Sequence, residues 1–545
     1  MRPADYHDRT KHHVNRLARS SGYLDWASQP APFRAYTGAP VTSLVPRAPV
    51  HSPPYFAYGQ LFDPPDGGGP GTAAAIGNSL RYALGLSAWK SFRGSRWALR
   101  VNPSSGNLHP TEAYVVTGPL VGVAATAGVY HYAPDRHELE LRAAFDADAW
   151  RAAAGGAAWL VALTSIHWRE AWKYGERAFR YCQHDLGHAV AALAMAARLE
   201  DLDARMLPGW SRAAIGALVG ADRDSDFGDA EREEPACVLA VGRGDGFGGL
   251  WSPAPRFLDA IARGSWTGHA TRLSGERLDW PAIDEVAEAT ADPGRGGVEG
   301  YLAGRTPRAP RERADATSDG PDPDARTVLL QRRSAVAFDG TTSMAGARFV
   351  AMLARTRPGP GAPWSALWWT PRLHLALFVH RVDGIEPGLY LLPRDRDAVP
   401  RLREAFGNDF LWEVADDSLP LVRLARGDGR RISQHVSCDQ AIAADGCFSV
   451  AMIADFARSL DEYGPSFYRH LFWEAGVIGQ VLYLEAEAAG ARGTGIGCFF
   501  DDLVHDRLGI TDHRFQSLYH FAVGRPVDDA RLTTEPGYPW EPLAP

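Results

Sequence analysis

The sequence contains few cysteines, and their spacing shows no pairing pattern. Five cysteines are an odd number for a chain of 545 residues, and none of them belongs to a C-x-x-C pair. This pattern disfavours both a disulfide framework and a zinc ribbon, so we interpret the cysteines as reduced thiols. Cys438 and Cys447 invite comparison with a redox pair, but on a helix they would face different sides. We therefore interpret these two as ordinary buried cysteines.

Long apolar runs and an excess of positive charge are also absent. No run of about 18 apolar residues occurs, and the N-terminal segment MRPADYHDRTKHHVNRL is charged and rich in histidine, unlike a secretory signal. The formal net charge of −8 gives no general attraction to nucleic acid or to anionic membranes. We expect a cytoplasmic protein that binds neither of them, and in which any bound anion is held by a local cluster of donors.

What is present is a long stretch of sequence that occurs twice. Residues around Tyr174 read KYGERAFRYCQHDLGHAVAALAMAA, and residues around Tyr463 read EYGPSFYRHLFWEAGVIGQVLYLEA. Aligning the two tyrosines without a gap superposes further identities: Gly175 on Gly464, Arg180 on Arg469, Gly187 on Gly476, Leu193 on Leu482 and Ala197 on Ala486. Upstream, Gly128-Val129-Tyr130 is matched by Gly388-Leu389-Tyr390 in the second copy. Downstream, LAVGR at 239–243 is matched by FAVGR at 521–525. Three matches in the same order indicate a duplicated domain.

Composition and linkers divide the chain further. A content of 45% hydrophobic and 22% charged residues is ordinary for globular domains. Segments 62–72 and 291–325 are rich in Pro, Gly and Asp, which favours solvated loops. The expected units are an N-terminal arm over 1–75, a first domain over 76–285, a linker over 286–325 and a second domain over 326–545.

Apolar periodicity predicts a mixture of helices and strands in both halves. The predicted helices lie near 79–88, 173–200, 346–355 and 465–490, and the predicted strands near 112–117, 157–164, 236–242, 373–380 and 517–523. Few strands together with long helices predict an α+β fold.

Several motifs, taken in their order, resemble one family. They are PSSGNLHP before a strand, RRS within QRRSAVAFDG, a long helix ending in GTGIGCFFDD, and the closing AVGRPVDDARL. Together with YHDRTKH, RYALGLSAW and KYGERAFRY, they are similar to the FMN-dependent nitroreductase fold, and within it to the branch of thiazole- and oxazole-forming (azoline) dehydrogenases. The resemblance covers nearly the whole chain. It implies two tandem nitroreductase-like domains that pack as an internal pseudodimer, with FMN in their interface.

The resemblance further implies a flavin site that takes residues from both halves. The second half contributes Arg332, Arg333, Ser334, Gly495, Ile496, Gly497 and Cys498, and the first half contributes Pro103, Ser104, Ser105 and Asn107. Adjacent arginines suit a phosphate, and Arg525 or Arg531 would add another guanidinium. Glycines let main-chain N–H groups approach the flavin ring.

The matching site on the other side of the pseudodimer lacks both pieces. The first half reads AAIGNSLRYALG in place of the arginines. The second half reads Pro363-Trp364-Ser365-Ala366 in place of the small residues, and the tryptophan would block close approach. We therefore predict one FMN for each chain.

Lys173 and Tyr174 are the candidate catalytic residues. In the resembling dehydrogenases a Lys-Tyr pair at this point is implied to abstract a proton, and the second half has Glu462-Tyr463 there. His184 and His188, in HDLGH, are spaced like zinc ligands, but no third ligand is evident. We expect no metal here, and a helix that packs between the halves with His188 hydrogen-bonded.

The expected reaction is dehydrogenation of an azoline, or of a similar C–N or C–S substrate, to an aromatic product. A hydride would pass to FMN, and oxygen would reoxidise the flavin. The substrate is a small molecule or a peptide in natural product biosynthesis, and a cyclodehydratase-type enzyme is a candidate partner. Two alternatives stay open: an NAD(P)H-dependent nitro or quinone reductase, and a non-catalytic docking partner.

Overall fold

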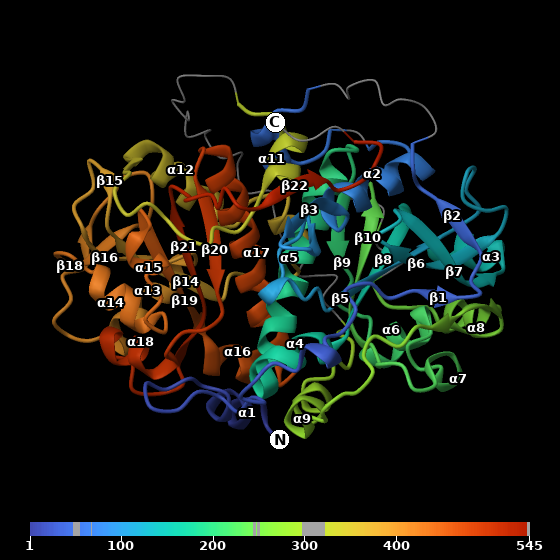
Figure 1. The fold of residues 1–545 in the computed structure, drawn as a ribbon, viewed down its shortest axis with the longest axis horizontal. Coiled ribbons are helices and arrows are strands. Elements are labelled where there is room, and N and C mark those ends of the chain that lie inside the picture. Colours follow the sequence, from blue (N-terminus) through green and yellow to red (C-terminus); the bar gives the residue numbers. More distant parts are fainter. Residues whose placement is uncertain (47–54, 67, 244–246, 248–250, 297–321, 542–545) are drawn as a thin grey trace.

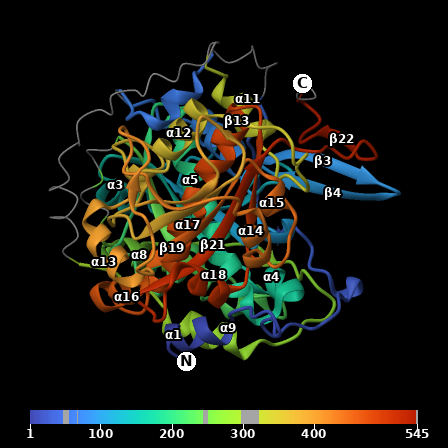
Figure 2. The ribbon, with the colours of Figure 1, turned by 90° about the vertical axis from the view of Figure 1, so that its left-hand side faces the viewer.

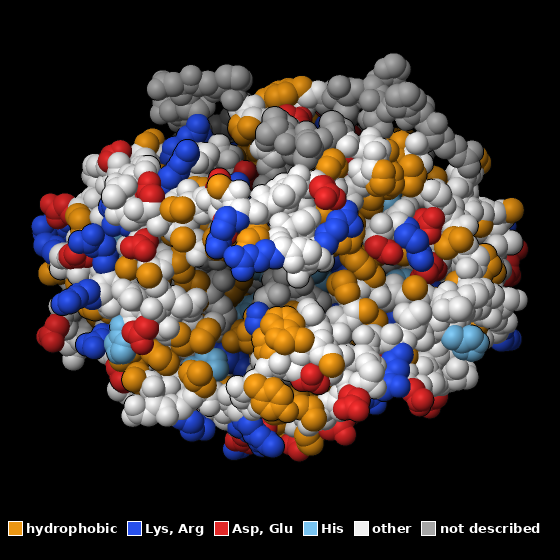
Figure 3. All heavy atoms as spheres, in the orientation of Figure 1, with side chains coloured by type: hydrophobic (Ala, Val, Ile, Leu, Met, Phe, Trp, Pro, Cys, Tyr) orange, Lys and Arg blue, Asp and Glu red, His pale blue; other side chains and the backbone are white. Residues whose placement is uncertain are grey.

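The protein is described here by a computed structural model that covers residues 1–46, 55–66, 68–243, 247, 251–296 and 322–541 (Figure 1). Its two halves lie side by side, and the long helices α5 and α17 run between them. Lys, Arg, Asp and Glu side chains are interspersed over the face shown in Figure 3, without a broad area of one sign. No described helix is long and apolar enough to cross a membrane.

The first half is built on an antiparallel sheet with the order β11-β7-β6-β5-β8-β10-β9, to which β2 adds along β7. Its strands are β2 (Val41–Ser43), β5 (Thr111–Thr117), β6 (Ala127–Ala133), β7 (Glu138–Phe145), β8 (Ala157–Ser165), β9 (Asp203–Met206), β10 (Glu234–Gly242) and β11 (Ser265–Trp266). The central strand β5 is buried along its whole length, as expected for a strand that is covered on both faces.

The second half repeats this sheet with the order β17-β18-β16-β14-β19-β21-β20. Its strands are β14 (Leu373–Val379), β16 (Gly388–Leu392), β17 (Glu413–Val414), β18 (Val422–Arg426), β19 (Phe448–Asp455), β20 (Arg492–Ile496) and β21 (Phe515–Gly524). Strand for strand, β7, β6, β5, β8, β10 and β9 correspond to β18, β16, β14, β19, β21 and β20. The duplication seen in the sequence is thus a duplication of the fold.

The helices between the sheets repeat in the same way. In the first half α4 (His167–Tyr174) leads into α5 (Ala178–Arg198), and in the second half α16 (Phe456–Tyr463) leads into α17 (Phe467–Ala488). The two long helices cross where their matching glycines, Gly187 and Gly476, meet. A methyl group on either glycine would run into the backbone of the opposite helix, at Trp473 and His184 respectively. The crossing therefore lies on the pseudo-twofold axis and requires glycine on both sides.

One hydrophobic core joins the halves, and the chain ends add further links. Buried residues of α5, α17 and both sheets belong to a single cluster. The C-terminal strand β22 (Thr533–Pro536) pairs with β3 (Leu86–Phe92), which forms a hairpin with β4 (Ser95–Arg100) that projects from the body in Figure 2. At the other end, His12 donates its backbone N–H to Asp501 of the second half (2.9 Å). The halves therefore behave as one folded body.

The remaining elements are short and lie around these layers. The helices are α1 (Pro3–Arg9), α2 (Ala73–Ala83), α3 (Ala147–Ala153), α6 (Arg212–Val219), α7 (Asp224–Phe227), α8 (Pro255–Ala262), α9 (Pro281–Ala289), α11 (Ala325–Gln331), α12 (Gly346–Arg355), α13 (Val399–Ala405), α14 (Arg430–Val436), α15 (Ile442–Asp445) and α18 (Asp501–Leu508). Small two-stranded sheets are formed by β1 (Tyr36–Thr37) with β12 (His269–Ala270) and by β13 (Met344–Ala345) with β15 (Val382–Asp383). Residues 297–321 of the predicted linker lie outside the described residues.

The α+β prediction is confirmed, and the differences concern element boundaries. The helix predicted near 79–88 is α2, which ends at Ala83, because the following residues form β3 in the projecting hairpin. The helix predicted over 173–200 is broken at Gly175, whose φ of 56° is left-handed and which packs against the backbone of Arg19. The glycine-rich segment predicted at a helix end is instead the edge strand β20, since α17 has already ended at Ala488.

Candidate functional site

The arginine element of the second half lies directly on the first half. Arg332 follows α11 and is buried, and its guanidinium donates to the carbonyls of Val101 (3.0 Å) and Arg100 (3.1 Å). Arg333 donates to the carbonyl of Ser87 in β3 (3.1 Å). The two sequence pieces that were predicted to share a site, RRS and the segment that opens with Pro103, are therefore adjacent.

This element forms a cluster of cations in which the Glu487 carboxylate acts on Arg332 and Arg333, and Asp528 pairs with Arg492. Burial, and then the Arg332 charge, lowers the pKa of Arg333 to about 10. Burial, followed by the charges of Arg333 and Arg492, lowers the pKa of Lys90. Neither Arg332 nor Arg333 has a carboxylate within ion-pair distance among the described residues, and Nη1 of Arg332 is buried without a hydrogen-bond partner. Such a cluster suits an anionic ligand such as a phosphate.

The glycine-rich strand β20 borders the arginines. Ser334 forms a bridge with Gly493, and its hydroxyl lies 2.9 Å from that of Tyr483. The Tyr483 hydroxyl in turn accepts the backbone N–H of Gly495 (2.8 Å). A side chain at Gly495 would collide with Tyr519, so the backbone here needs glycine. The structure thus brings Ser334 and Gly495 together, as predicted, and adds Tyr483 between them.

Residues that follow β20 turn towards the first half. The carbonyl of Gly497 accepts hydrogen bonds from Arg177 and from the hydroxyl of Tyr181, both at 3.2 Å. Ile496 is buried, whereas Cys498 is half-buried and faces Cys438. The interpretation of Cys438 as an ordinary buried cysteine is therefore wrong, because its side chain is half-buried and contacts the Cys498 thiol. Cys447 is buried as expected.

The Pro-Ser-Ser element is a tight turn that presents its backbone. Gly106, Asn107 and His109 all have left-handed φ angles, between 51° and 60°. Asn107 is held by hydrogen bonds to the carbonyl of Ala98 and to the ring of His109, both at 2.9 Å. Pro103 is buried at the start of the turn. Three left-handed residues in so short a segment are uncommon and indicate a conformation fixed by its surroundings.

Lys173 and Tyr174 lie against this turn. A methyl group on Gly106 would be 2.7 Å from the Tyr174 hydroxyl and 3.2 Å from Nζ of Lys173. Nζ also lies 5.2 Å from the centroid of the Tyr174 ring. Burial, and then the Glu170 carboxylate, raises the pKa of Tyr174 well above its usual value. Tyr174 is thus protonated at neutral pH and can donate a hydrogen bond, and the Lys173 amine lies beside it.

Two buried acids beneath the turn were missed by the sequence analysis. Asp185 of α5 accepts the backbone N–H of Ser105 (3.1 Å) and its hydroxyl (3.2 Å), and Glu170 of α4 lies 3.4 Å from the Ser104 hydroxyl. Burial raises the pKa of Asp185 to about 7. Burial, and then the Asp185 charge, raises the pKa of Glu170. Asp185 lies within the HDLGH motif, whose histidine spacing resembles that of metal ligands. The motif carries no sequence signal of a carboxyl pair with Glu170.

That histidine motif has a packing role. His188 lies 3.3 Å from both Gln480 and the Tyr519 hydroxyl of the second half, which confirms the predicted hydrogen bonding between halves. His184 stacks on the Tyr519 ring at a centroid distance of 4.2 Å. Among the described residues, no group of three or more His, Cys, Asp or Glu side chains is arranged to hold a metal ion.

Arg531 is not brought to this cluster. Its guanidinium pairs with Asp529 at 2.7 Å, and its side chain is 72% exposed. It lies over Phe92, at the projecting end of β3, whereas Arg333 contacts Ser87 at the beginning of that strand. A cation closer to the arginines is Arg492, the first residue of β20, which the sequence analysis did not single out.

The matching region of the other pseudo-site is filled by aromatic side chains. Trp364, Trp368 and Trp369 are all buried there. The Arg394 guanidinium lies 4.6 Å from the Trp364 ring centroid and pairs with Glu474. On the first-half side, the place of the arginine element is taken by α2, whose Arg81 pairs with Glu541.

Corresponding positions in the two halves also carry acidic residues with different partners. Glu474 occupies the place of Asp185, but it is paired with Arg394 and accepts backbone N–H groups of Arg372 and Leu373. Glu462 occupies the place of Lys173 and pairs with Arg372 (2.7 Å). The carboxyls with raised pKa values and Lys173 thus belong to the first half, on which the arginine element of the second half lies.

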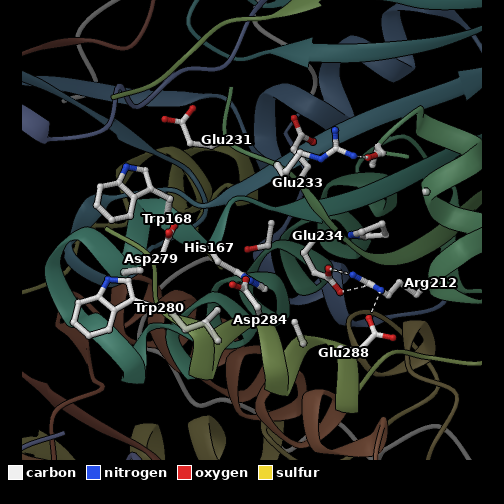
Figure 4. A pocket seen from close by; sticks show the side chains of 18 of the residues that line it. His167, Trp168, Arg212, Glu231, Glu233, Glu234, Asp279, Trp280, Asp284 and Glu288 are labelled. Carbon is white, nitrogen blue, oxygen red and sulfur yellow. Dashed lines mark hydrogen bonds and ion pairs between the residues drawn. The ribbon is translucent and has the colours of Figure 1, made fainter. Parts of the chain in front are cut away.

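A separate cavity of about 840 Å³ lies on the other side of α4. Figure 4 shows Trp168 and Trp280 along one side of it, and Arg212 held by Glu234 and Glu288. None of the predicted site residues is among the described residues that line it. Carboxylates outnumber arginines in its lining, so it would repel a phosphate. Its size alone therefore does not make it the flavin site.

Comparisons with known proteins agree with the duplicated fold. The model of the Nitroreductase family matches residues 93–243 and 388–525. A crystal structure named as a nitroreductase from Anabaena variabilis is 21% identical, with a TM-score of 0.69 over 96% of this chain and 99% of that one. One from Ralstonia eutropha is 19% identical, with a TM-score of 0.27 over 41% of this chain and 96% of that one. The E. coli microcin synthetase McbBCD, solved with truncated pro-MccB17, is 20% identical, with a TM-score of 0.25 over 36% and 70%. No curated protein matches the chain.

Proposed function

The chain belongs to the nitroreductase family, whose members typically bind FMN, and on this premise we propose that it is an FMN-dependent dehydrogenase that aromatises an azoline or a similar C–N or C–S substrate. The observation that carries the proposal is the meeting of Lys173 and Tyr174 with the turn at Gly106, beside the arginine element of the other half. The proposal is supported because an amine, a hydrogen-bond donor and a cation cluster lie along one segment, residues 100–106.

The residues present fit FMN. Arg332 has a buried Nη1 without a partner, and it stands with Arg333, Arg492 and Lys90 in a cluster whose cations outnumber its carboxylates, Glu487 and Asp528. These side chains would hold the phosphate. The backbone of Gly495 to Cys498 and the turn from Pro103 to Asn107 would hold the ring, because glycines and small residues allow close approach. When bound, FMN supplies a two-electron acceptor.

Lys173 is proposed as the base that takes a proton from the substrate carbon. Lys173 is half-buried beside the turn, and the neutral form of its amine would accept the proton. Tyr174 stays protonated, because burial raises its pKa, so it donates a hydrogen bond rather than accepting the proton. It would orient a nitrogen or sulfur atom of the substrate next to Nζ.

Glu170 and Asp185 are proposed to hold one proton between them beneath the site. Two buried carboxyls in contact do not both ionise readily near neutral pH. Ser104 and Ser105 connect this pair to the turn, so its charge is felt by the groups that position the substrate. The pair thereby lets the site hold or release a proton near pH 7 without solvent entry.

The experiment that tests the proposal compares two substrate classes. The purified chain is incubated with an azoline-containing peptide under oxygen, without NAD(P)H, and the peptide mass is followed. Loss of two hydrogen atoms is expected. A parallel assay follows NADPH oxidation with a nitro compound and a quinone. Rapid NADPH turnover with no change in the azoline would instead assign a reductase, and a chain that retains no flavin would favour a docking role.

A further inference from the structure

Two half-buried cysteines face each other at the end of the glycine-rich segment. Sγ of Cys498 lies 2.8 Å from Sγ of Cys438, a thiol–thiol hydrogen bond. Cys498 follows β20, and Cys438 lies between α14 and α15. Both side chains keep partial exposure, unlike the buried Cys182, Cys237 and Cys447. A small reagent can therefore reach this pair.

The backbone around the pair is fixed so that the sulfurs stay in contact. Cys438 and Asp439 both have left-handed φ angles, 54° and 57°, which non-glycine residues adopt rarely. The side-chain amide of Gln440 donates to the carbonyls of Ser437 (2.8 Å) and Cys498 (2.9 Å). This amide ties the turn that carries one cysteine to the segment that carries the other.

The surroundings activate one of the two thiols. The hydrogen bond shared with Cys438, assisted by His12 and Arg177, lowers the pKa of Cys498 to about 5. Arg177 is anchored by Asp501 and by the carbonyl of Gly497, so its charge stays beside the sulfur. A thiolate next to a protonated thiol is the arrangement of an attacking and a resolving cysteine.

We propose that Cys438 and Cys498 form a reversible dithiol–disulfide centre that hydrogen peroxide oxidises. The Cys498 thiolate attacks one peroxide oxygen, so that an S–O bond forms, the O–O bond breaks and hydroxide leaves as water after protonation. The Cys438 sulfur then attacks the sulfenic sulfur of Cys498. The S–S bond forms, the S–O bond breaks, and hydroxide leaves with the proton of Cys438 as a second water.

The balance is two thiols and one peroxide giving one disulfide and two waters. Two electrons pass from the sulfurs to the peroxide, and a dithiol reductant returns two electrons and two protons. Sulfurs already in contact need little approach to bond. This inference goes beyond the proposed function and does not depend on it, because the bond forms between two side chains of this chain whether or not FMN is bound.

The test is a thiol count and a peptide map of the full chain. The native protein is treated with one equivalent of hydrogen peroxide, alkylated in denaturant and digested. Two of the five thiols should be lost, in one cross-linked peptide pair that joins Cys438 to Cys498 and that dithiothreitol reverses. Cys498 should react about tenfold or more faster than Cys447, whose pKa burial raises to about 11.

Three variants separate this centre from general oxidation. Cys447→Ser should still lose two thiols. Cys438→Ser should stop at a sulfenic acid on Cys498 that dimedone traps, and Cys498→Ser should leave Cys438 unreactive. No cross-link in the wild-type chain, a cross-link between other cysteines, or equal oxidation of Cys498→Ser and wild type would each overturn the proposal. The wild-type peptide map decides the question even where a variant folds poorly.

Discussion

Asp185 and Glu474 occupy the same place in the two halves, but their surroundings give them different properties. Glu474 is paired with Arg394, whereas Asp185 faces a second carboxyl, that of Glu170, and forms no ion pair with an arginine of the described residues. Ser459 is the counterpart of Glu170 in the second half, so the second half does not repeat the carboxyl pair. At the scale of residues, the two halves share a backbone fold, but the carboxyl pair of Glu170 and Asp185 belongs to the first half.

The Lys173→Ala and Glu462→Ala variants test this division. If Lys173 is the base, its loss should lower turnover by about a hundredfold to ten-thousandfold while FMN content and fold are unchanged. Glu462→Ala should have little effect, because its partner Arg372 lies in the tryptophan-filled region. Turnover and flavin content of both proteins are measured side by side. Equal losses of activity, or loss of flavin from Lys173→Ala, would make the lysine structural.

The Asp185→Asn variant tests the proton held by the buried acids. Burial raises the pKa of Asp185 to about 7 in the folded chain, whereas the unfolded value is near 3.9. Its contribution to stability is thus fully present below about pH 4 and is lost as pH rises through about 7, at up to about 1.4 kcal/mol for each pH unit between them.

Asparagine cannot titrate but still accepts the hydrogen bonds of Ser105. The free energy of unfolding of the variant should therefore fall less than that of the wild type between pH 5 and pH 8. Urea unfolding of both proteins at the two pH values measures this difference. Parallel changes in the two proteins would show that Asp185 does not hold a proton in the folded chain.

At the scale of elements, the sequence predicted the strands and helices that occur in both halves. It did not predict secondary structure that depends on pairing with a distant segment. The strands at β5, β8, β10, β14 and β21 and the helix α17 lie close to their predicted positions, because their apolar patterns are sufficient. Residues 86–88 were predicted as helix and are strand, since β4 pairs with Leu86 and Ala88, and β22 from the far end of the chain pairs with Ala88. The segment at Gly495 is strand because β21 lies beside it. Neither β22 nor β21 can be identified as the pairing strand from the local sequence.

The crossing of α5 and α17 gives a prediction at this scale. Gly187→Ala places a methyl group against the backbone of Trp473, which cannot move aside as a flexible side chain would. We expect the free energy of unfolding to fall by about 1 to 3 kcal/mol or more, as for overpacked cores. Gly275→Ala is the matched control, because nothing lies within 4 Å of its added methyl group. Thermal unfolding of both proteins provides the comparison, and equal midpoints would contradict the close crossing.

At the scale of the whole molecule, the duplication places both pieces of the proposed flavin site in one chain. The RRS element and the Pro-Ser-Ser turn are far apart in sequence, and the fold joins them through Arg332 and the carbonyl of Val101. The repeat and the motif order were enough to predict this meeting. The Glu170–Asp185 pair and the Cys438–Cys498 contact were not predictable, because each depends on how separate elements pack.

The number of FMN molecules bound by each chain distinguishes one flavin site from two. The chain is reconstituted with excess FMN, freed of unbound flavin, and assayed for flavin released on denaturation against protein concentration. We predict about one FMN for each chain, because one interface carries the cation cluster, strand β20 and the Pro-Ser-Ser turn, while the other is filled by Trp364 and its neighbours. Two FMN for each chain, or none, would contradict it.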